Sequence, residues 1–332
     1  MTSRPFVNKV LRVIATLAAG AAIASLASAQ ATYPDKPIRI LVGFAAGSGT
    51  DTIARRIGDS MGQAMKQPII IENRPGAMTA IASEAVARAP ADGYTLLLAN
   101  NAGMSLAPGG LIGKVNYDPL KDFTPIGRII FVNFLMVSNP KLNINTPAEM
   151  TAYFKANPSQ AICGAGNATG KIFCEFYKKV TGLDIAVVSY KTSNEALSAL
   201  VGGQIPMMFL DTLTAIPRMK QAQVKLLAYM GPQRNPVLPI VPSQVEAGLT
   251  GFPTIAGGWT GLYAPAGLPP AIMNKLNAEL NAALARPAVR DYFTETGMEI
   301  VPTTPEEMAR YARGDLEMWR KLIQDFKIGP EG

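Results

Sequence analysis

Two glycine-containing stretches stand where an apolar run gives way to a segment of helical period, and both have the residue types of an anion site. The first is "GFAAGSGTDTIARR", residues 43–56, and the second is "CGAGNATGK", residues 163–171. At a strand-to-helix turn, backbone N–H groups lie beside the positive end of the helix dipole and can bind a carboxylate or a phosphate. Two such loops on two lobes predict one cleft that holds a ligand with two anionic ends.

The residue types of the first loop exclude two nucleotide-binding motifs. A P-loop needs a lysine after its last glycine, and none follows Gly49 at that place. A dinucleotide-binding loop needs a third glycine, and Thr52 occupies that position. We therefore interpret the loop as an unspecialised oxyanion site, to which Ser48 and Thr50 add hydroxyl donors. A tight turn without a ligand is the alternative that this motif alone leaves open.

The absence of one residue type excludes most catalytic chemistry. The chain has no histidine and two cysteines among its 332 residues. Ser-His-Asp and Cys-His catalysis and the common zinc sites need histidine, and two cysteines cannot form a metal centre alone. We therefore expect no catalytic residues, no cofactor and no metal, and a secreted hydrolase is the least favoured function.

The first residues predict export from the cytoplasm. Arg4, Lys9 and Arg12 precede an apolar stretch that ends in "ASAQ", which is typical of a cleavable signal peptide over residues 1–29 with the cut after Ala29. An uncleaved anchor is the alternative, but the stretch is shorter than the roughly 20 residues that a bilayer span needs. The mature protein is therefore expected in the periplasm.

Charge and length narrow the class of protein further. The formal net charge of +7 includes the three positive charges of the leader, and no run of five or six basic residues occurs, so nucleic acid is not an expected partner. A chain of 332 residues exceeds the usual size of a single core and favours two lobes. We expect the protein to be a monomer.

The alternation of β-rich runs with segments of helical period predicts an α/β fold with largely parallel sheets. Strands are expected at "IRILVGF", "PIIIEN", "YTLLLAN", "IIFVNFLMVSN", "AICGAGN", "DIAVVSY", "IPMMFLD" and "GWTGLYA". Thr146, Thr192 and Thr304 each precede a glutamate by three residues, and these capping boxes predict three helix starts. The order predicts lobe 1 over residues 30–130, lobe 2 over 131–252, and a return to lobe 1 over 253–332.

Segments along nearly the whole mature chain resemble the Bug family, the periplasmic solute-binding proteins of tripartite tricarboxylate transporters. They are "YPDKPIRILVGFAAGSGTDTIARR", "QPIIIENRPGA", "DGYTLLLAN", "NYDPLKDFTPIG", "YKTSNEALSALVGGQI", "LDTLTAIPRMK", "VPSQVEAGL", "GWTGLYAPAGLP" and "TPEEMARY". The resemblance implies a two-lobed Venus-flytrap fold that closes on a small carboxylate, such as a dicarboxylate, a tricarboxylate or an aromatic acid. It also implies a membrane permease as partner.

The resemblance implies ligand contacts from both lobes. In the first lobe these are Phe44, Ser48, Gly49, Thr50, Asp51, Asn100, Asn101 and Ala102, and in the second lobe Asn167, Ala168, Thr169 and Asp211. Asp51 has an alternative role as a first-turn helix residue, and Asp211 as a solvated turn carboxylate.

Three positions depart from the family pattern. Where relatives often read "RPGAGG", this chain reads "RPGAM" from Arg74, so bulk replaces a glycine pair. Met78 either lines the pocket against a flat apolar ligand or packs in the core. Lys171 stands where many relatives carry histidine or glutamine, and Asn167 where glycine is frequent; Lys171 either contacts the ligand or points into solvent.

Cys163 and Cys174 are expected to form a disulfide, because the protein is exported and the two residues lie near a strand end and in the following helix. Two buried free thiols are the alternative. The function that we favour is a non-catalytic carrier that delivers a small organic acid to a permease. The alternative is a sensor module that binds the same ligand and docks on a membrane signalling receptor.

Overall fold

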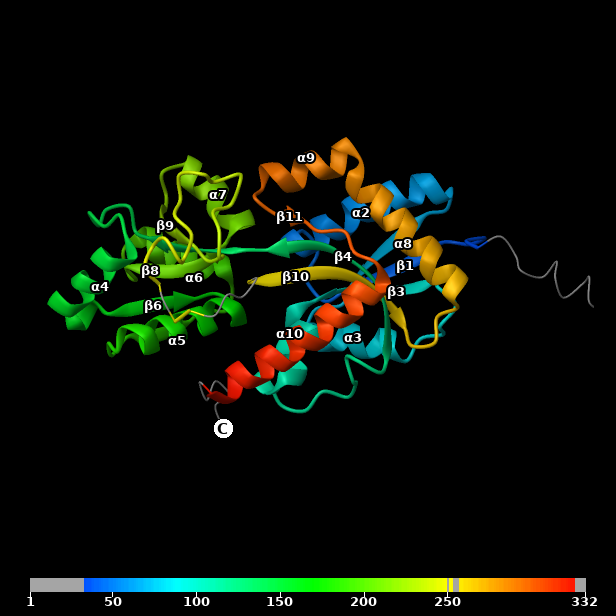
Figure 1. Ribbon diagram of the computed structural model, residues 1–332, viewed down its shortest axis with the longest axis horizontal. Helices are drawn as coiled ribbons and strands as arrows, with labels where there is room; N and C mark the ends of the chain where they lie inside the picture. Colours follow the sequence, from blue (N-terminus) through cyan, green and yellow to red (C-terminus); the bar gives the residue numbers. More distant parts are fainter. Residues whose placement is uncertain (1–32, 250, 253–256, 326–332) are drawn as a thin grey trace, which may run out of the picture.

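The structure is a computed structural model that describes residues 33–249, 251–252 and 257–325, so the predicted signal peptide lies outside it. Two sheets form two halves of the molecule, and helices cover both faces of each sheet (Figure 1). This is the expected two-lobed α/β fold. In the described ranges, no helix is both long and apolar enough to cross a bilayer.

The first lobe contains a six-stranded sheet in the order β11-β4-β10-β3-β1-β2. Its strands are β1 (Ile38–Val42), β2 (Ile69–Asn73), β3 (Thr95–Asn100), β4 (Phe123–Val132), β10 (Gly258–Pro265) and β11 (Glu299–Ile300). Its helical segments are α2 (Gly49–Met65), η1 (Ala77–Thr79), α3 (Ala80–Ala87), η2 (Ala102–Leu111), α8 (Pro270–Ala285), α9 (Pro287–Glu295) and α10 (Pro305–Asp325).

The second lobe contains a five-stranded sheet in the order β7-β6-β8-β5-β9. Its strands are β5 (Phe134–Ser138), β6 (Ile162–Ala165), β7 (Ala186–Ser189), β8 (Met207–Asp211) and β9 (Lys225–Tyr229). Its helical segments are α4 (Pro147–Ala156), η3 (Pro158–Gln160), α5 (Ala168–Thr181), α6 (Ser193–Gly202) and α7 (Thr212–Lys220). The predicted lobe ranges stay predictions; the strands of the first sheet fall within residues 38–132 and 258–300.

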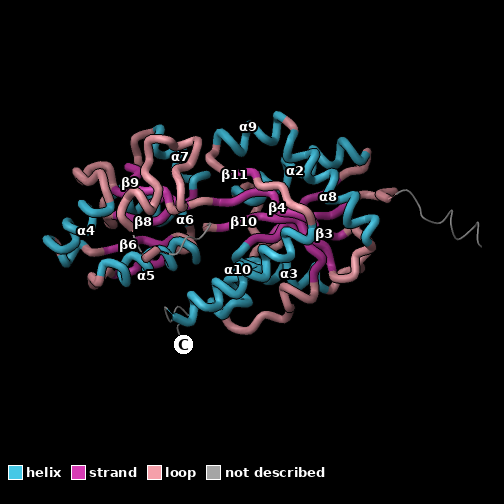
Figure 2. Tube along the Cα trace, viewed as in Figure 1, coloured by secondary structure: helices cyan, strands magenta, loops and turns pink. Residues whose placement is uncertain are grey.

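Both sheets are mixed, which corrects the expectation of largely parallel sheets. β1 runs parallel to β2 and β3, and β6 runs parallel to β7 and β8. β10 is antiparallel to β3 and β4, and β5 is antiparallel to β8 and β9. The reason is that the chain crosses between the lobes: β4 leads into β5 through Asn133, and β10 brings the chain back (Figure 2). The crossing strands therefore run against their neighbours.

Side-chain alternation along the central strands fills a core on each face of each sheet. Ile40 and Val42 of β1 pack with α2, whereas Leu41 packs with Trp259 on the opposite face. In β8, Phe209 belongs to a group that we call the Phe173 cluster. Its buried members include Phe134, Phe154, Phe173, Phe176, Tyr177 and Phe209 of the second lobe, and Leu106, Trp319 and Ile323 of the first.

The buried carboxylate of Asp315 connects α10, the last helix, to the first lobe through hydrogen bonds. Asp315 of α10 accepts hydrogen bonds from Ser105 Oγ in η2 at 2.5 Å and from Trp259 Nε1 in β10 at 2.7 Å. Burial raises the pKa of Asp315, and these two donors act in the opposite direction. α10 also contributes Trp319 and Ile323 to the Phe173 cluster, which contains residues of both lobes.

The local helix signals are confirmed. The hydroxyl oxygens of Thr146, Thr192 and Thr304 accept hydrogen bonds from the backbone N–H of the glutamate three residues later, at 3.1, 3.1 and 3.2 Å. Cys163 of β6 and Cys174 of α5 form a disulfide with an S–S distance of 1.98 Å, as expected. This bond closes the loop that contains Asn167 and Thr169.

Replacement of both cysteines by alanine should lower the free energy of unfolding by roughly 2–4 kcal/mol, because the unfolded chain gains conformational freedom. Urea denaturation of the oxidised protein, the reduced protein and the variant measures this loss. The reduced wild type serves as the control, since it keeps both sulfur atoms. Two reactive thiols in the denatured, unreduced protein would contradict the bridge.

Candidate functional site

Strand register places the carboxyl ends of both parallel strand sets at the junction of the lobes. Asn100, the last residue of β3, pairs with Thr260 near the start of β10, where the chain has just returned from the second lobe. Asp211, the last residue of β8, pairs with Phe134 at the start of β5, where the chain has just entered. The loops that follow β1, β2 and β3 therefore face those that follow β6, β7 and β8 across the junction.

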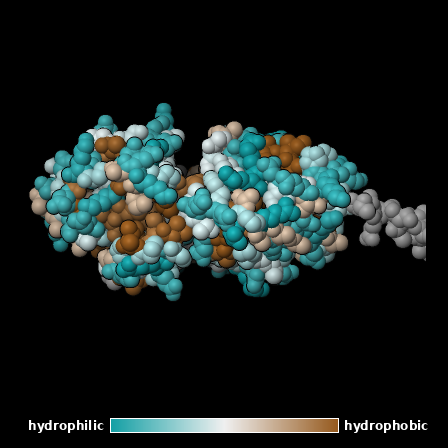
Figure 3. Space-filling model, turned by 90° about the horizontal axis from the view of Figure 1, so that it is seen from above, coloured by the Kyte–Doolittle hydropathy of each residue, from teal (hydrophilic) through white to brown (hydrophobic). Residues whose placement is uncertain are grey.

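The two lobes meet at this junction. A Cβ atom added at Gly49 would lie 2.4 Å from Leu213 Cδ2, so the start of α2 lies close to the start of α7. Phe44 and Leu213 both pack against the core of the first lobe. Figure 3 shows the molecule narrowing between its halves, with apolar surface on the second lobe beside the narrow part.

The first predicted loop forms a capped helix start with unused donors. Ser48 is the N-cap of α2, and its Oγ accepts a hydrogen bond from the Asp51 N–H at 3.2 Å. The N–H groups of Gly49 and Thr50, the first two of the helix, donate no hydrogen bond within the described residues, as expected at a helix N-terminus. They are therefore available to an acceptor in the junction.

Asp51 uses its carboxylate inside the protein. It is 3% exposed, and its oxygens accept hydrogen bonds from Gly47 N–H at 2.9 Å, from Arg55 at 3.0 Å and from Asn73 Nδ2 at 2.9 Å. The hydrogen bond from Arg55 contributes most to holding the pKa of Asp51 at about 2, below its ordinary value of 3.8. We therefore assign Asp51 to shaping the loop, the alternative role considered for it.

The residues after β3 hold neighbouring segments. Asn100 Oδ1 accepts hydrogen bonds from Gly103 N–H at 3.2 Å and from Thr79 Oγ1 at 3.4 Å, and Asn101 Nδ2 donates to Gly257 O at 3.4 Å. Both asparagines are buried, while Ala102 begins η2 and is partly exposed. The Nδ2 group of Asn100 has no partner within the described residues and remains available to a ligand.

The second predicted loop repeats the capped helix start. Asn167 is the N-cap of α5; its Oδ1 accepts from Gly170 N–H at 2.8 Å, and its Nδ2 donates to Ser193 Oγ at 3.1 Å, which joins the starts of α5 and α6. The N–H groups of Ala168 and Thr169 donate no hydrogen bond in the described part of the chain. Thr169 is buried, and Lys171 lies partly buried in the same first turn.

Asp211 resembles Asp51 in acting on its own helix. It is the N-cap of α7, and its Oδ1 accepts a hydrogen bond from Thr214 N–H at 2.8 Å. Burial raises the pKa of Asp211. Its neighbours Asn133 and Thr212 were not among the predicted site residues. Asn133 Nδ2 and Thr212 Oγ1 are buried without a partner in the described residues, and a lone asparagine inside the apolar run "IIFVNFLMV" is the signal that marks this position.

The loop after β2 contains strained backbone that sequence patterns did not reveal. Ala77, Met78 and Thr79 have φ angles of 46, 51 and 70°, in the left-handed region. For residues other than glycine this conformation costs about 1–2 kcal/mol each. Three in succession at the edge of the junction mark the turn as a functional candidate.

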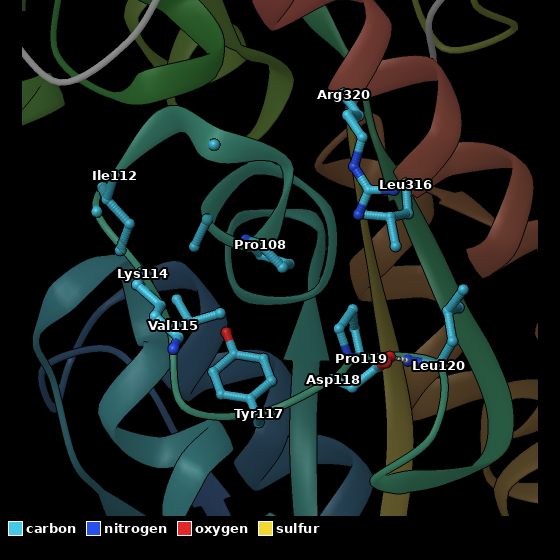
Figure 4. Close-up of a pocket in the computed structure, with 13 residues that line it drawn as sticks. Pro108, Ile112, Lys114, Val115, Tyr117, Asp118, Pro119, Leu120, Leu316 and Arg320 are labelled. Carbon is cyan, nitrogen blue, oxygen red and sulfur yellow. Dashed lines mark hydrogen bonds between the residues drawn. The ribbon is translucent and has the colours of Figure 1, made fainter.

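A pocket of about 510 Å³ lies elsewhere on the first lobe, between η2, the segment 112–120 and α10 (Figure 4). Lys114 and Arg320 lie at its edge, and Pro108, Val115 and Leu316 contribute apolar surface. None of its lining residues is a predicted ligand contact, so the helix starts at the junction remain the candidate site. The described residues contain no group of side chains suited to a metal ion.

Two α/β lobes joined by crossing strands, with helix starts facing each other, define a two-lobed solute-binding protein. The family model described as "Tripartite tricarboxylate transporter family receptor" matches residues 53–328, and the chain belongs to this family. Its structural neighbours are periplasmic binding proteins and not enzymes.

Three relatives illustrate the similarity. BugT of Bordetella pertussis is 30% identical over 321 residues, which cover 96% of this chain and 97% of BugT. The structure of MatC from Rhodopseudomonas palustris with bound malate matches with a TM-score of 0.76 and 31% identity, over 88% of this chain and 100% of MatC. R. palustris Rpa4515 with adipate matches with a TM-score of 0.81 and 28% identity, over 90% of this chain and 99% of that one.

Asp51→Asn should lower the stability of the protein at neutral pH, because the amide cannot form the ion pair with Arg55. Since the folded pKa is about 2 and the ordinary value is 3.8, the stabilisation is present above pH 3.8 and is lost as the pH falls toward 2. Urea denaturation of wild type and variant between pH 7 and 2 measures the difference. Asp184→Asn, at a fully exposed carboxylate, is the control. If the difference in the free energy of unfolding between wild type and Asp51→Asn is the same at every pH, the ionised Asp51 carboxylate does not stabilise the protein.

Proposed function

We propose that this chain captures a small organic carboxylate between its lobes and delivers it to the membrane permease of a tripartite transporter. The observation that carries the proposal is the pair of capped helix starts, α2 and α5, which belong to different lobes and keep N–H donors unused. Each start favours a negative charge through the helix dipole. A ligand with two carboxylates satisfies both.

The donors suggest how the ligand is held. One carboxylate accepts hydrogen bonds from the N–H groups of Gly49 and Thr50 and from the Thr50 hydroxyl. The other accepts from the N–H groups of Ala168 and Thr169 and from the Thr169 hydroxyl. Asn100 Nδ2 adds a donor from the first lobe. Closure of the lobes would exclude water from these bonds and strengthen them.

Similar proteins support both the ligand class and the partner. The similar structures of MatC and Rpa4515 contain malate and adipate, both dicarboxylates. The family description supports a membrane transporter as partner. Delivery in the periplasm is consistent with the predicted leader over residues 1–29, and we propose a monomeric carrier.

The mature protein should melt at a higher temperature in the presence of some carboxylates, because a ligand that binds only the native state stabilises it. The panel contains mono-, di- and tricarboxylates and aromatic acids, and the measurement is a thermal-shift titration. The corresponding neutral amides are the matched controls. A complete panel without a shift would count against carboxylate binding.

Thr50→Val and Thr169→Val should each weaken the binding of a dicarboxylate by about 0.5–1.5 kcal/mol, or roughly two- to twelvefold in Kd, because each removes one hydroxyl donor and keeps the side-chain shape. Calorimetry measures Kd. Thr52→Val is the matched control, since Thr52 Oγ1 already donates to Ser48 O within α2. If Thr169→Val binds as wild type does while Thr50→Val loses affinity, the second lobe does not hold a carboxylate.

A further inference from the structure

The left-handed turn at residues 77–79 is held in place by contacts that fix one side chain. Thr79 is buried, and its Oγ1 donates to Asn100 Oδ1 at 3.4 Å. A Cβ atom added at Gly43 would lie 2.3 Å from Thr79 Cβ, and one added at Gly103 would lie 2.2 Å from Thr79 Oγ1. The side chain of Thr79 thus fills a space shared by the loops after β1, β2 and β3, which explains how a strained conformation persists there.

The same turn places Met78 against a cluster to which both lobes contribute. Met78 is partly buried and packs against the Phe173 cluster, most of whose buried members belong to the second lobe. Ala168, the first residue of α5 and a predicted ligand contact, packs against the same cluster. Ala77, which shares the left-handed conformation, is exposed and takes no part in these contacts.

We propose that Met78 forms an apolar wall of the carboxylate site, and that the substrate class is therefore a carboxylate with an apolar or aromatic body. This inference rests on the proposed function and deepens it. A methionine side chain is flexible and polarisable, and it adapts to the face or edge of an aromatic ring. Helix starts supply the donors for the carboxylates, and Met78 supplies contact area for the carbon skeleton between them.

Substituted succinates test this wall, because they keep both carboxylates and their spacing. Malate carries a hydroxyl group, methylsuccinate a methyl group and phenylsuccinate a phenyl ring on the same skeleton. Wild type should bind phenylsuccinate about tenfold more tightly than malate, with methylsuccinate between them, since the apolar substituent is removed from water. Calorimetry on the purified mature protein measures the three affinities.

Met78→Gly and Met78→Ala should each reduce this preference to within about threefold, while Met78→Leu should retain it. Ala77→Gly is the matched control: it relieves the same backbone strain one residue earlier but removes no wall, so the preference should persist. A thermal melt checks that each variant folds; in Met78→Gly the relief of backbone strain at a φ of 51° offsets part of the packing that is lost with the side chain. Met78→Ala removes the wall without freeing the backbone and separates the two effects.

The outcomes distinguish the wall from the function on which it rests. If wild type binds carboxylates but does not favour the apolar substituents, or if the preference survives in both Met78→Gly and Met78→Ala, the wall is refuted and carboxylate binding stands. A loss of preference in Ala77→Gly would assign the effect to backbone conformation and would also refute it. If wild type binds no carboxylate of the broader panel, the proposed function itself fails.

Discussion

The antiparallel pairing of β4 with β10 is the constraint from which the geometry of the junction follows. β4 leaves the first lobe and β10 returns to it, and their register pairs residues 123–132 with 258–265. In the first lobe, β3 pairs antiparallel with β10, so β3 ends beside the start of β10. In the second lobe, β8 pairs antiparallel with β5, which continues β4, so β8 ends beside the start of β5. β1 and β2 run in the same direction as β3, and β6 and β7 run in the same direction as β8. The helices that follow these strands therefore start at the junction. Opposed helix starts are thus a consequence of how the chain crosses.

The two acidic side chains at the junction, Asp51 and Asp211, each accept a hydrogen bond at the start of a helix, while other N–H donors there stay unused. Asp51 is bound by Gly47, Arg55 and Asn73, and Asp211 by Thr214. A carboxylate without such partners would repel an anionic ligand more strongly. Instead, each supports a helix start from within. The positive potential comes from helix dipoles, which are fixed by the fold and lose no side-chain freedom when a ligand binds.

Sequence reasoning succeeded where the determinants are local. The capping boxes at Thr146, Thr192 and Thr304 are three-residue signals, and the strand-to-helix loops are visible as a change of hydrophobic period. It failed where the determinants lie far apart. Asn73, which binds Asp51, is 22 residues away from it, and the antiparallel direction of β10 depends on a strand more than a hundred residues earlier. The helix α7, which contains Pro217, was not among the predicted elements.

The left-handed turn was missed for a different reason. Ala, Met and Thr carry no propensity for positive φ, so only their packing can impose it. The space shared by Gly43, Thr79 and Gly103 forms when three loops meet, and each loop alone is an ordinary connection. The "RPGAM" departure from the family pattern was visible in the sequence, but the sequence did not show which residues the side chain of Met78 contacts.

Contacts within the protein fix the loops that precede α2 and α5 without a ligand. In the first lobe, the side chain of Thr79 contacts the loops at Gly43 and Gly103 and donates a hydrogen bond to Asn100, so it connects the loops after β1, β2 and β3. In the second lobe, the disulfide between Cys163 and Cys174 closes the loop before α5, and Asn167 joins that loop to α6. Ordering a loop on binding costs conformational entropy, and loops already held avoid that cost. Between the lobes, Asn133 separates β4 from β5. Under the proposed function, a ligand that binds donors of both lobes favours the closed arrangement, because it binds that arrangement more tightly than one in which the donors are apart.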